Sequence, residues 1–152
     1  MRGDGRAVAC GDNDHGQCDL PELEPGAGWV QVAAGANHTV LLRSDGRAVA
    51  CGQNAVGQCD ILELEQGASY IKAAAGDTHT VLLRSDGRAV ACGENDLGQC
   101  RIPELGPGES YSDVVAGCSH TVLLRSDGRA AACGANQYGQ CDLPDCEAGV
   151  SY

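Results

Sequence analysis

A repeat of 41 residues runs through the whole chain without insertions. The dipeptide Asp-Gly recurs at Asp4, Asp45, Asp86 and Asp127, each 41 positions after the last. Other residue types keep the same step: Cys10, Cys51, Cys92 and Cys133; Cys18, Cys59, Cys100 and Cys141; His38, His79 and His120; Trp29, Tyr70, Tyr111 and Tyr152. Agreement among independent residue types excludes coincidence. The chain is therefore predicted to be a stack of like supersecondary units, each packed on its neighbours.

Each repeat predicts short strands joined by tight turns. In the second unit we expect strands over 30–34, 38–43 and 48–51, and a short outer strand over 59–61. The 38–43 segment is apolar on both faces, as expected of a strand sandwiched between two sheets. The Ser-Asp-Gly-Arg segment that follows it predicts a two-residue hairpin, because Asp-Gly supplies the positive φ angles that such a turn needs. A four-stranded meander of about 40 residues is the size of a propeller blade.

The repeated motif resembles a known family. One copy reads Ala34-Gly35-x-x-His38-Thr39-x-x-Leu42-x-x-Asp45-Gly46, then Cys51-Gly52-x-Asn54-x-x-Gly57-Gln58. This string resembles the RCC1 repeat, although Cys stands where the family often has Trp before the Gly of Gly52 and Leu after Gly-Gln. The resemblance implies an all-β fold, a partial β-propeller with an arc of about 3.5 four-stranded blades. Blades this short are similar to those of bacterial members, which include a β-lactamase inhibitor protein.

The repeat divides the chain into units of a single incomplete propeller domain, spanning 1–29, 30–70, 71–111 and 112–152. One stretch, the counterpart of 30–41, is missing from a whole number of repeats. We therefore expect open blade faces, and a second protein or a second copy that covers at least one of them.

Charge and hydropathy argue against several classes of protein. The net charge is −11, from 21 acidic and 10 basic residues, without the clustered Lys and Arg that nucleic-acid binding requires. No run of about 18 apolar residues exists, so no membrane-spanning segment is predicted. Residues 1–5 lack the apolar stretch of a signal peptide, which favours an intracellular location.

No group of residues has the pattern of a catalytic centre. His38, His79 and His120 are three equivalent copies, which argues for a repeated structural hydrogen bond rather than a catalytic base. Cysteine pairs eight residues apart do not match zinc-site spacing, and no glycine-rich loop opens onto a helix. We therefore predict no enzyme activity, no metal, no cofactor and no small-molecule ligand.

The periodic cysteines allow three interpretations. Buried, reduced thiols are favoured, because the cysteines stand at positions that are apolar in the family pattern. One disulfide per blade and metal binding are the alternatives. Cys118 and Cys146 lie outside the repeat, so we expect them to be the more exposed thiols.

Repeated polar residues are assigned structural roles, and residues that vary between repeats are assigned to binding. The hairpin turns explain Asp45, Asp86 and Asp127, and capping of loop backbone explains Asn54, Asn95 and Asn136. The variable positions are His15, Val56, Leu97 and Tyr138 in one set of loops, and Asn37, Thr78 and Ser119 in another. Repeat proteins keep the scaffold constant and vary the binding face, so these residues are predicted to line one rim and contact a protein. Neutral variation at loop tips is the competing explanation.

These observations predict a non-catalytic protein–protein interaction module that is an accessory subunit or a part of a larger assembly. The alternative, implied by the resemblance alone, is a guanine-nucleotide exchange factor-like domain for a small GTPase.

Overall fold

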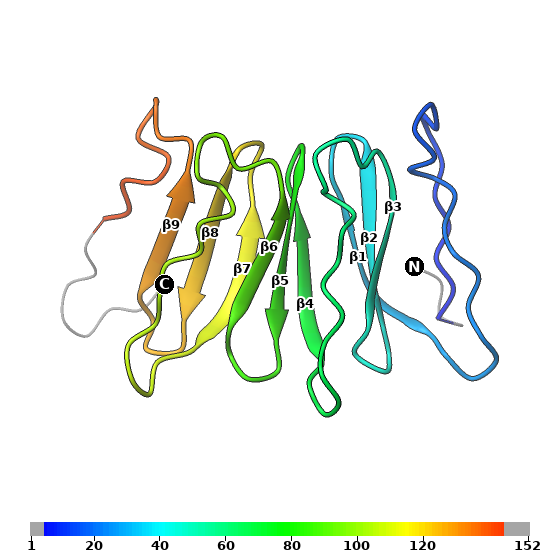
Figure 1. Ribbon diagram of the computed structural model, residues 1–152, viewed down its shortest axis with the longest axis horizontal. Coiled ribbons are helices and arrows are strands. Elements are labelled where there is room, and N and C mark those ends of the chain that lie inside the picture. The colour runs from blue at the N-terminus through cyan, green and yellow to red at the C-terminus, as the bar shows by residue number, and fades with distance from the viewer. Residues whose placement is uncertain (1–4, 145–152) are drawn as a thin grey trace.

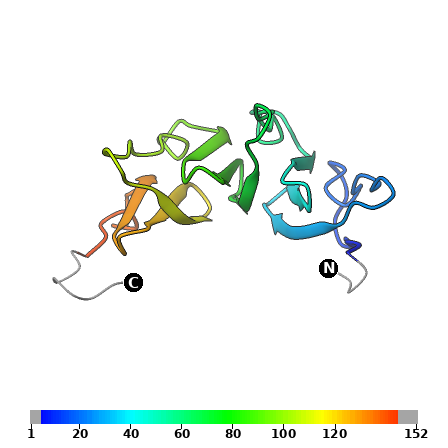
Figure 2. The ribbon, with the colours of Figure 1, turned by 90° about the horizontal axis from the view of Figure 1, so that it is seen from below.

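The computed structural model describes residues 5–144, which contain nine strands and no helix. The strands are β1 (Trp29–Ala34), β2 (His38–Arg43), β3 (Ala48–Gly52), β4 (Tyr70–Ala75), β5 (His79–Arg84), β6 (Ala89–Gly93), β7 (Tyr111–Ala116), β8 (His120–Arg125) and β9 (Ala130–Gly134). They form three antiparallel sheets in the orders β1-β2-β3, β4-β5-β6 and β7-β8-β9 (Figure 1). The sheets stand side by side along an arc (Figure 2). This confirms the predicted all-β, partial-propeller architecture.

Each blade has three strands, so the prediction of a fourth, outer strand over 59–61 is wrong. In that segment the backbone donors are used locally. The Cys59 N–H donates to Asn54 Oδ1 at 2.8 Å, and the Asp60 and Ile61 N–H groups donate to the carbonyls of Gly57 and Cys59 at 3.1 and 2.8 Å. A β-strand uses its backbone N–H groups to hydrogen-bond the neighbouring strand, and in this segment those N–H groups are already bonded locally.

The hairpins differ from the two-residue turns that we predicted. The Arg43 N–H donates to the Arg47 carbonyl at 2.8 Å and the Gly46 N–H to the Arg43 carbonyl at 3.0 Å, which encloses a three-residue loop. Gly46 has φ +81°, whereas no residue other than glycine has a positive φ in the described part of the chain. This is a type I turn followed by a glycine bulge, in which only the glycine needs the left-handed conformation.

The core lies between blades rather than within them. All residues of β2 from His38 to Leu42 are buried, and so are the five equivalent residues of β5. Between the first two blades the packed residues are Val40, Leu42, Tyr70, Ala73 and Leu82. Between the second and third they are Val81, Leu83, Tyr111, Val114 and Leu123. Each fully buried leucine stabilises the packing by about 1.5–3 kcal/mol, so the interfaces between blades hold the arc together.

A polar link also crosses each interface. His38 Nε2 lies 2.9 Å from Thr80 Oγ1 of the next blade, and Thr80 Oγ1 donates to the Gln58 carbonyl at 2.7 Å. Because the threonine proton is used toward the carbonyl, the histidine donates from Nε2. His79 repeats the link with Thr121 at 3.0 Å. The histidines therefore join neighbouring blades.

The described cysteines carry free thiols, but none of them is fully buried. The prediction that the periodic cysteines are buried is wrong, because those in the described part of the chain are half-buried or exposed. Cys118 is exposed as predicted and Cys10 is exposed as well, whereas Cys146 lies outside the described residues. Burial still raises the pKa of Cys92 and Cys100 to about 11, which keeps both thiols protonated at neutral pH.

Candidate functional site

The loops that carry the variable residues lie together along one edge of the arc. One set holds Val56, Leu97 and Tyr138 in the loops after β3, β6 and β9, and His15 in the equivalent loop of the first unit; we call these four residues the tips. The second set joins the first two strands of each blade and holds Asn37, Thr78 and Ser119. Both sets lie at the upper edge in Figure 1, which we call the rim, whereas the Asp-Gly hairpins lie at the opposite edge.

Every tip is held by the same set of hydrogen bonds. In the second unit the Val56 N–H donates to Gln58 Oε1 at 3.1 Å, and the Gly57 N–H donates to the Asn54 carbonyl at 3.3 Å. The N–H groups of His15, Leu97 and Tyr138 donate to the equivalent glutamines at 3.0, 3.0 and 2.9 Å. The tip loops therefore share one backbone conformation and differ in the side chain that they present.

The asparagines cap these loops from within. Asn54 Oδ1 accepts the Cys59 N–H at 2.8 Å, and Asn95 and Asn136 accept the equivalent N–H groups at 3.0 and 2.8 Å. Asn54 Nδ2 also donates to Asp60 Oδ1 at 2.7 Å. Both the Oδ1 and the Nδ2 atoms of Asn54 thus form hydrogen bonds within its own loop, and these bonds support the tip.

The tips expose apolar surface to solvent. Val56 is 45% exposed, Leu97 48% and Tyr138 93%, and His15 is also exposed. Apolar and aromatic side chains that are exposed on a rigid support are typical of protein contacts.

The second set of loops supports the tips from the inner side of the arc. Asn37, Thr78 and Ser119 are half-buried, and their carbonyls accept N–H groups of the tip loops at 2.7–2.9 Å. Thr78 Oγ1 donates to Glu94 Oε2 at 2.6 Å. Their neighbours Ala36, Asp77 and Cys118 are the exposed residues of these loops. The structure therefore brings both predicted sets together, with the inner set partly covered.

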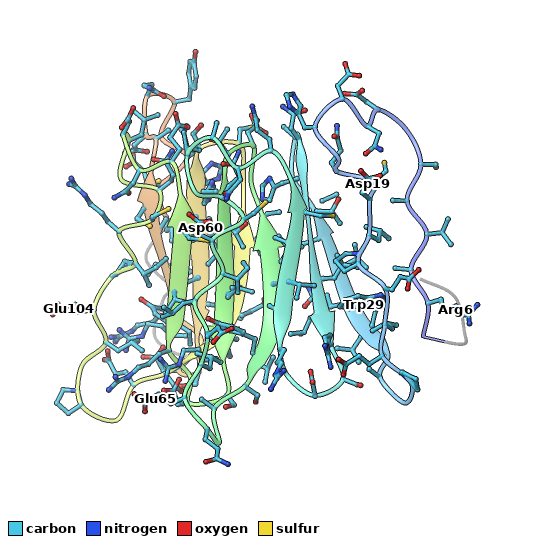
Figure 3. All side chains as sticks on the ribbon, turned by 45° about the vertical axis from the view of Figure 1, so that its right-hand side comes forward. Arg6, Asp19, Trp29, Asp60, Glu65 and Glu104 are labelled. Atoms are coloured by element: carbon cyan, nitrogen blue, oxygen red, sulfur yellow. The ribbon has the colours of Figure 1, made fainter. Side chains whose placement is uncertain are left out.

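The rim is acidic. Its exposed carboxylates are Asp12, Asp14, Asp19, Asp60, Asp77, Asp96 and Asp142. Arg101 is the only lysine or arginine in the same loops. Figure 3 shows Asp19 and Asp60 on the half of the molecule that carries the rim, and Glu65 and Glu104 toward the opposite edge.

The hairpins at the opposite edge use their carboxylates internally. Asp45 Oδ1 accepts the Arg47 N–H at 3.1 Å, and Asp45 Oδ2 pairs with the Arg43 guanidinium at 2.9 Å. The backbone hydrogen bond from Arg47 and the nearby guanidinium groups hold the pKa of Asp45 below its usual value. Asp86 and Asp127 make the equivalent bonds to Arg88 and Arg129. These aspartates close the hairpins.

Two sets of buried residues with clear roles received none in our sequence predictions. The glutamines Gln17, Gln58 and Gln99 support the tips, and the threonines Thr39, Thr80 and Thr121 link the blades. Both sets follow the 41-residue step, in the Gly-Gln and His-Thr dipeptides. In the sequence, only their 41-residue spacing marks these residues, because the histidines that contact Thr80 and Thr121 lie in another unit.

Among residues 5–144, no three His, Cys, Asp or Glu side chains converge in a way that could hold a metal ion. No helix in this range could span a bilayer. A cavity of about 500 Å³ at the edge opposite the rim is lined by Arg43, Asp45, Arg47, Glu63 and Glu65 among others. Its charges are of both signs.

The family model for the regulator of chromosome condensation (RCC1) repeat matches residues 29–58, 70–99 and 111–140. No significant match is found among curated protein sequences. Each matched segment runs from the start of a blade's first strand to the glutamine under the tip.

Solved structures share the fold at low sequence identity. Prp20p from Saccharomyces cerevisiae is 22% identical, with a TM-score of 0.67 over 82% of this chain and 40% of its own. The CRINKLY WD40 ectodomain of the Arabidopsis thaliana receptor kinase ACR4 is 18% identical, with a TM-score of 0.69 over 89% of this chain and 49% of its own. Human WBSCR16 is 19% identical, with a TM-score of 0.63 over 74% of this chain and 36% of its own. The chain thus spans less than half the length of each of these structures.

Proposed function

Because the chain belongs to the regulator of chromosome condensation (RCC1) repeat family, we propose that it is a non-catalytic protein–protein interaction module that binds its partner through the rim. One observation carries this proposal. Tip loops with the same backbone conformation present different side chains, namely His15, Val56, Leu97 and Tyr138. A constant support with variable exposed residues is the arrangement by which repeat proteins bind.

The rigidity of the tips favours binding. In each tip loop, backbone N–H groups donate to the side-chain oxygens of the loop's own asparagine and glutamine, so little conformational freedom is lost when a partner docks. The exposed apolar surface of Val56, Leu97 and Tyr138 would be removed from water by the same event. Both effects favour association.

Two of the similar structures are of one yeast protein, Prp20, which has protein partners. Prp20p is described by its binding to Gsp1p and histones, and yeast RCC1 (Prp20) by its complex with Kap60. At this level of identity the likeness concerns the fold alone, and the partner of this chain is proposed only as a protein. As an accessory subunit or a part of a larger assembly, the chain would contribute a binding surface.

Exchange-factor activity is the second candidate, and the structural likeness to Prp20p is its only support. We expect that adding the chain to a small GTPase loaded with a fluorescent guanine nucleotide leaves the rate of nucleotide release unchanged. A large acceleration would favour the exchange factor over the binding module.

Site-specific photo-crosslinking tests the rim as the binding surface. A photoreactive amino acid is placed at Leu97 on a tip, or at the similarly exposed Leu62 on the segment that leads away from the rim. We expect a discrete protein adduct in native cells from position 97 and none from position 62. Equal adducts from both positions, or an adduct from position 62 alone, would contradict the proposal.

A further inference from the structure

We infer that the partner of the rim is a basic polypeptide surface, in which lysine or arginine side chains flank apolar ones. This inference rests on the proposed function and adds the chemistry of the partner. It follows from the charge of the rim, from the pairing of charges elsewhere, and from the side chains that stand among the rim carboxylates.

The rim carboxylates are not neutralised within the described part of the molecule. Ion pairs among residues 5–144 join Arg43 to Asp45, Lys72 to Asp113, Arg84 to Asp86, and Arg125 to Glu109 and Asp127. None of them involves Asp14, Asp77 or Asp96, which are exposed on the rim. Arg43, Arg84, Arg125 and Lys72 are thus paired with carboxylates away from the rim, and the rim keeps its negative charge.

This charge selects the class of partner. Exposed charges act over about one Debye length, roughly 8 Å at physiological ionic strength, so the local rim charge matters more than the net charge of the chain. A negative surface attracts and orients a positive partner and repels phosphate backbones. With no cluster of ligands for a metal ion among the described residues, a basic protein surface is the fitting counter-charge.

The side chains between the carboxylates suit lysine and arginine in particular. Lysine and arginine carry an apolar stem and a charged head, so their stems fit against Val56 and Leu97 while their heads reach Asp14, Asp77 or Asp96. Tyr138, 93% exposed, offers a ring face to a guanidinium. Apolar residues on the same partner would cover the rest of the tips.

The test measures binding of labelled peptides of equal length to the full chain by fluorescence anisotropy. One peptide alternates lysine or arginine with leucine or tyrosine, the second has glutamate in place of each basic residue, and the third has serine in place of each apolar residue. The rim variant is Asp14→Asn, Asp77→Asn and Asp96→Asn together. Its matched control is Glu63→Gln, Glu65→Gln and Glu104→Gln, which changes the net charge equally with residues of the outer loops.

We expect the basic, apolar peptide to bind the wild type most tightly. The rim variant should weaken it about tenfold at low salt, and the control variant by less than about twofold. An equal loss in both variants, or equal binding of the glutamate peptide, would overturn the inference. If the glutamate peptide binds and Val56→Ser, Leu97→Ser and Tyr138→Ser together abolish its binding, the rim remains an interaction surface and only the basic partner is excluded.

Discussion

At the scale of single residues, the glutamine under each tip shows how small differences between repeats matter. Gln17 Nε2 and Gln99 Nε2 donate to the carboxylates of Asp12 and Glu94, at 3.3 and 3.4 Å. In the second unit the equivalent position is Gln53, and Gln58 Nε2 is buried with no hydrogen-bond partner among the described residues. An unsatisfied buried donor destabilises the folded state, so this unit carries a defect that its neighbours lack.

Replacing Gln53 by glutamate should repair that defect. The new carboxylate would accept from Gln58 Nε2, as Glu94 accepts from Gln99, and raise the free energy of unfolding by about 0.5–1.5 kcal/mol. Urea denaturation measures the change. Gln137→Glu adds the same charge at an exposed rim position and is the control, with no gain expected. Equal effects of the two substitutions would refute the explanation.

The interblade histidines make stability depend on pH. Burial lowers the pKa of His38 and His79; the flanking histidines lower that of His79 further, while Asp77 and Glu94 oppose the shift. Their Nδ1 atoms are buried without a partner in the described part of the chain, so a second ring proton would have no acceptor. A histidine whose pKa is depressed by folding contributes full stability above its unfolded pKa, and that stability is lost as the pH falls below it.

We therefore expect the free energy of unfolding to fall between about pH 6.5 and 5, by about 1.4 kcal/mol per pH unit for each histidine that stays neutral. Carboxylates with a lowered pKa, such as Asp45 and Asp127, act only below about pH 4. Denaturant titrations at several pH values measure the slope. A flat profile down to pH 5 would contradict the prediction.

At the scale of elements, the Asp-Gly hairpin connects local conformation with packing between units. Gly46 has φ +81°, and a Cβ at this position would overlap Ser69 Cβ at the start of the next blade. The Gly46 carbonyl also accepts the Tyr70 N–H at 2.7 Å. The glycine thus supplies the bulge of the turn and the space for the neighbouring blade.

Gly46→Ala should therefore cost more than the loss of a left-handed glycine alone. Gly67 also has a positive φ, +94°, but no atom lies within 4 Å of the position that a Cβ would take. Gly67→Ala therefore measures only the cost of placing a side chain in the left-handed conformation, about 1–2 kcal/mol. Gly46→Ala adds the overlap with Ser69 and should destabilise the chain clearly further. Thermal unfolding of both variants measures the difference, and equal losses would show that the contact relaxes freely.

At the scale of the whole molecule, the three blades in residues 5–144 are joined by a repeated interface, and the first of them has no strand before it in that range. Val32 is 38% exposed, whereas its equivalents Ala73 and Val114 are 3% and 2% exposed. Each of the latter packs against the blade before it, and no strand precedes Trp29 in the described residues. The same residue position is thus core in one blade and surface in another.

The polar links between blades should likewise contribute less stability at the first blade than at the second. Thr39 Oγ1 donates to the Gln17 carbonyl at 2.8 Å and, within residues 5–144, accepts from no histidine, whereas Thr80 also accepts from His38. Thr39→Val should cost about 1 kcal/mol, and Thr80→Val about 2–3 kcal/mol because His38 Nε2 is left buried without an acceptor. Denaturant unfolding of both variants tests this. Equal costs would mean that the histidine link adds nothing to stability.

The sequence by itself determined the repeat, the first three strands of each blade and the grouping of variable loops on one edge, because these depend on patterns within 41 residues. Only the tertiary structure decided that 59–61 is not a strand, that the hairpin loop has three residues, and that most of the described cysteines are half-buried. It also decided that His38 meets Thr80, a residue of the next blade. These features depend on which acceptor each backbone N–H group bonds and on how neighbouring blades pack. The sequence pattern of a single 41-residue unit contains neither kind of information.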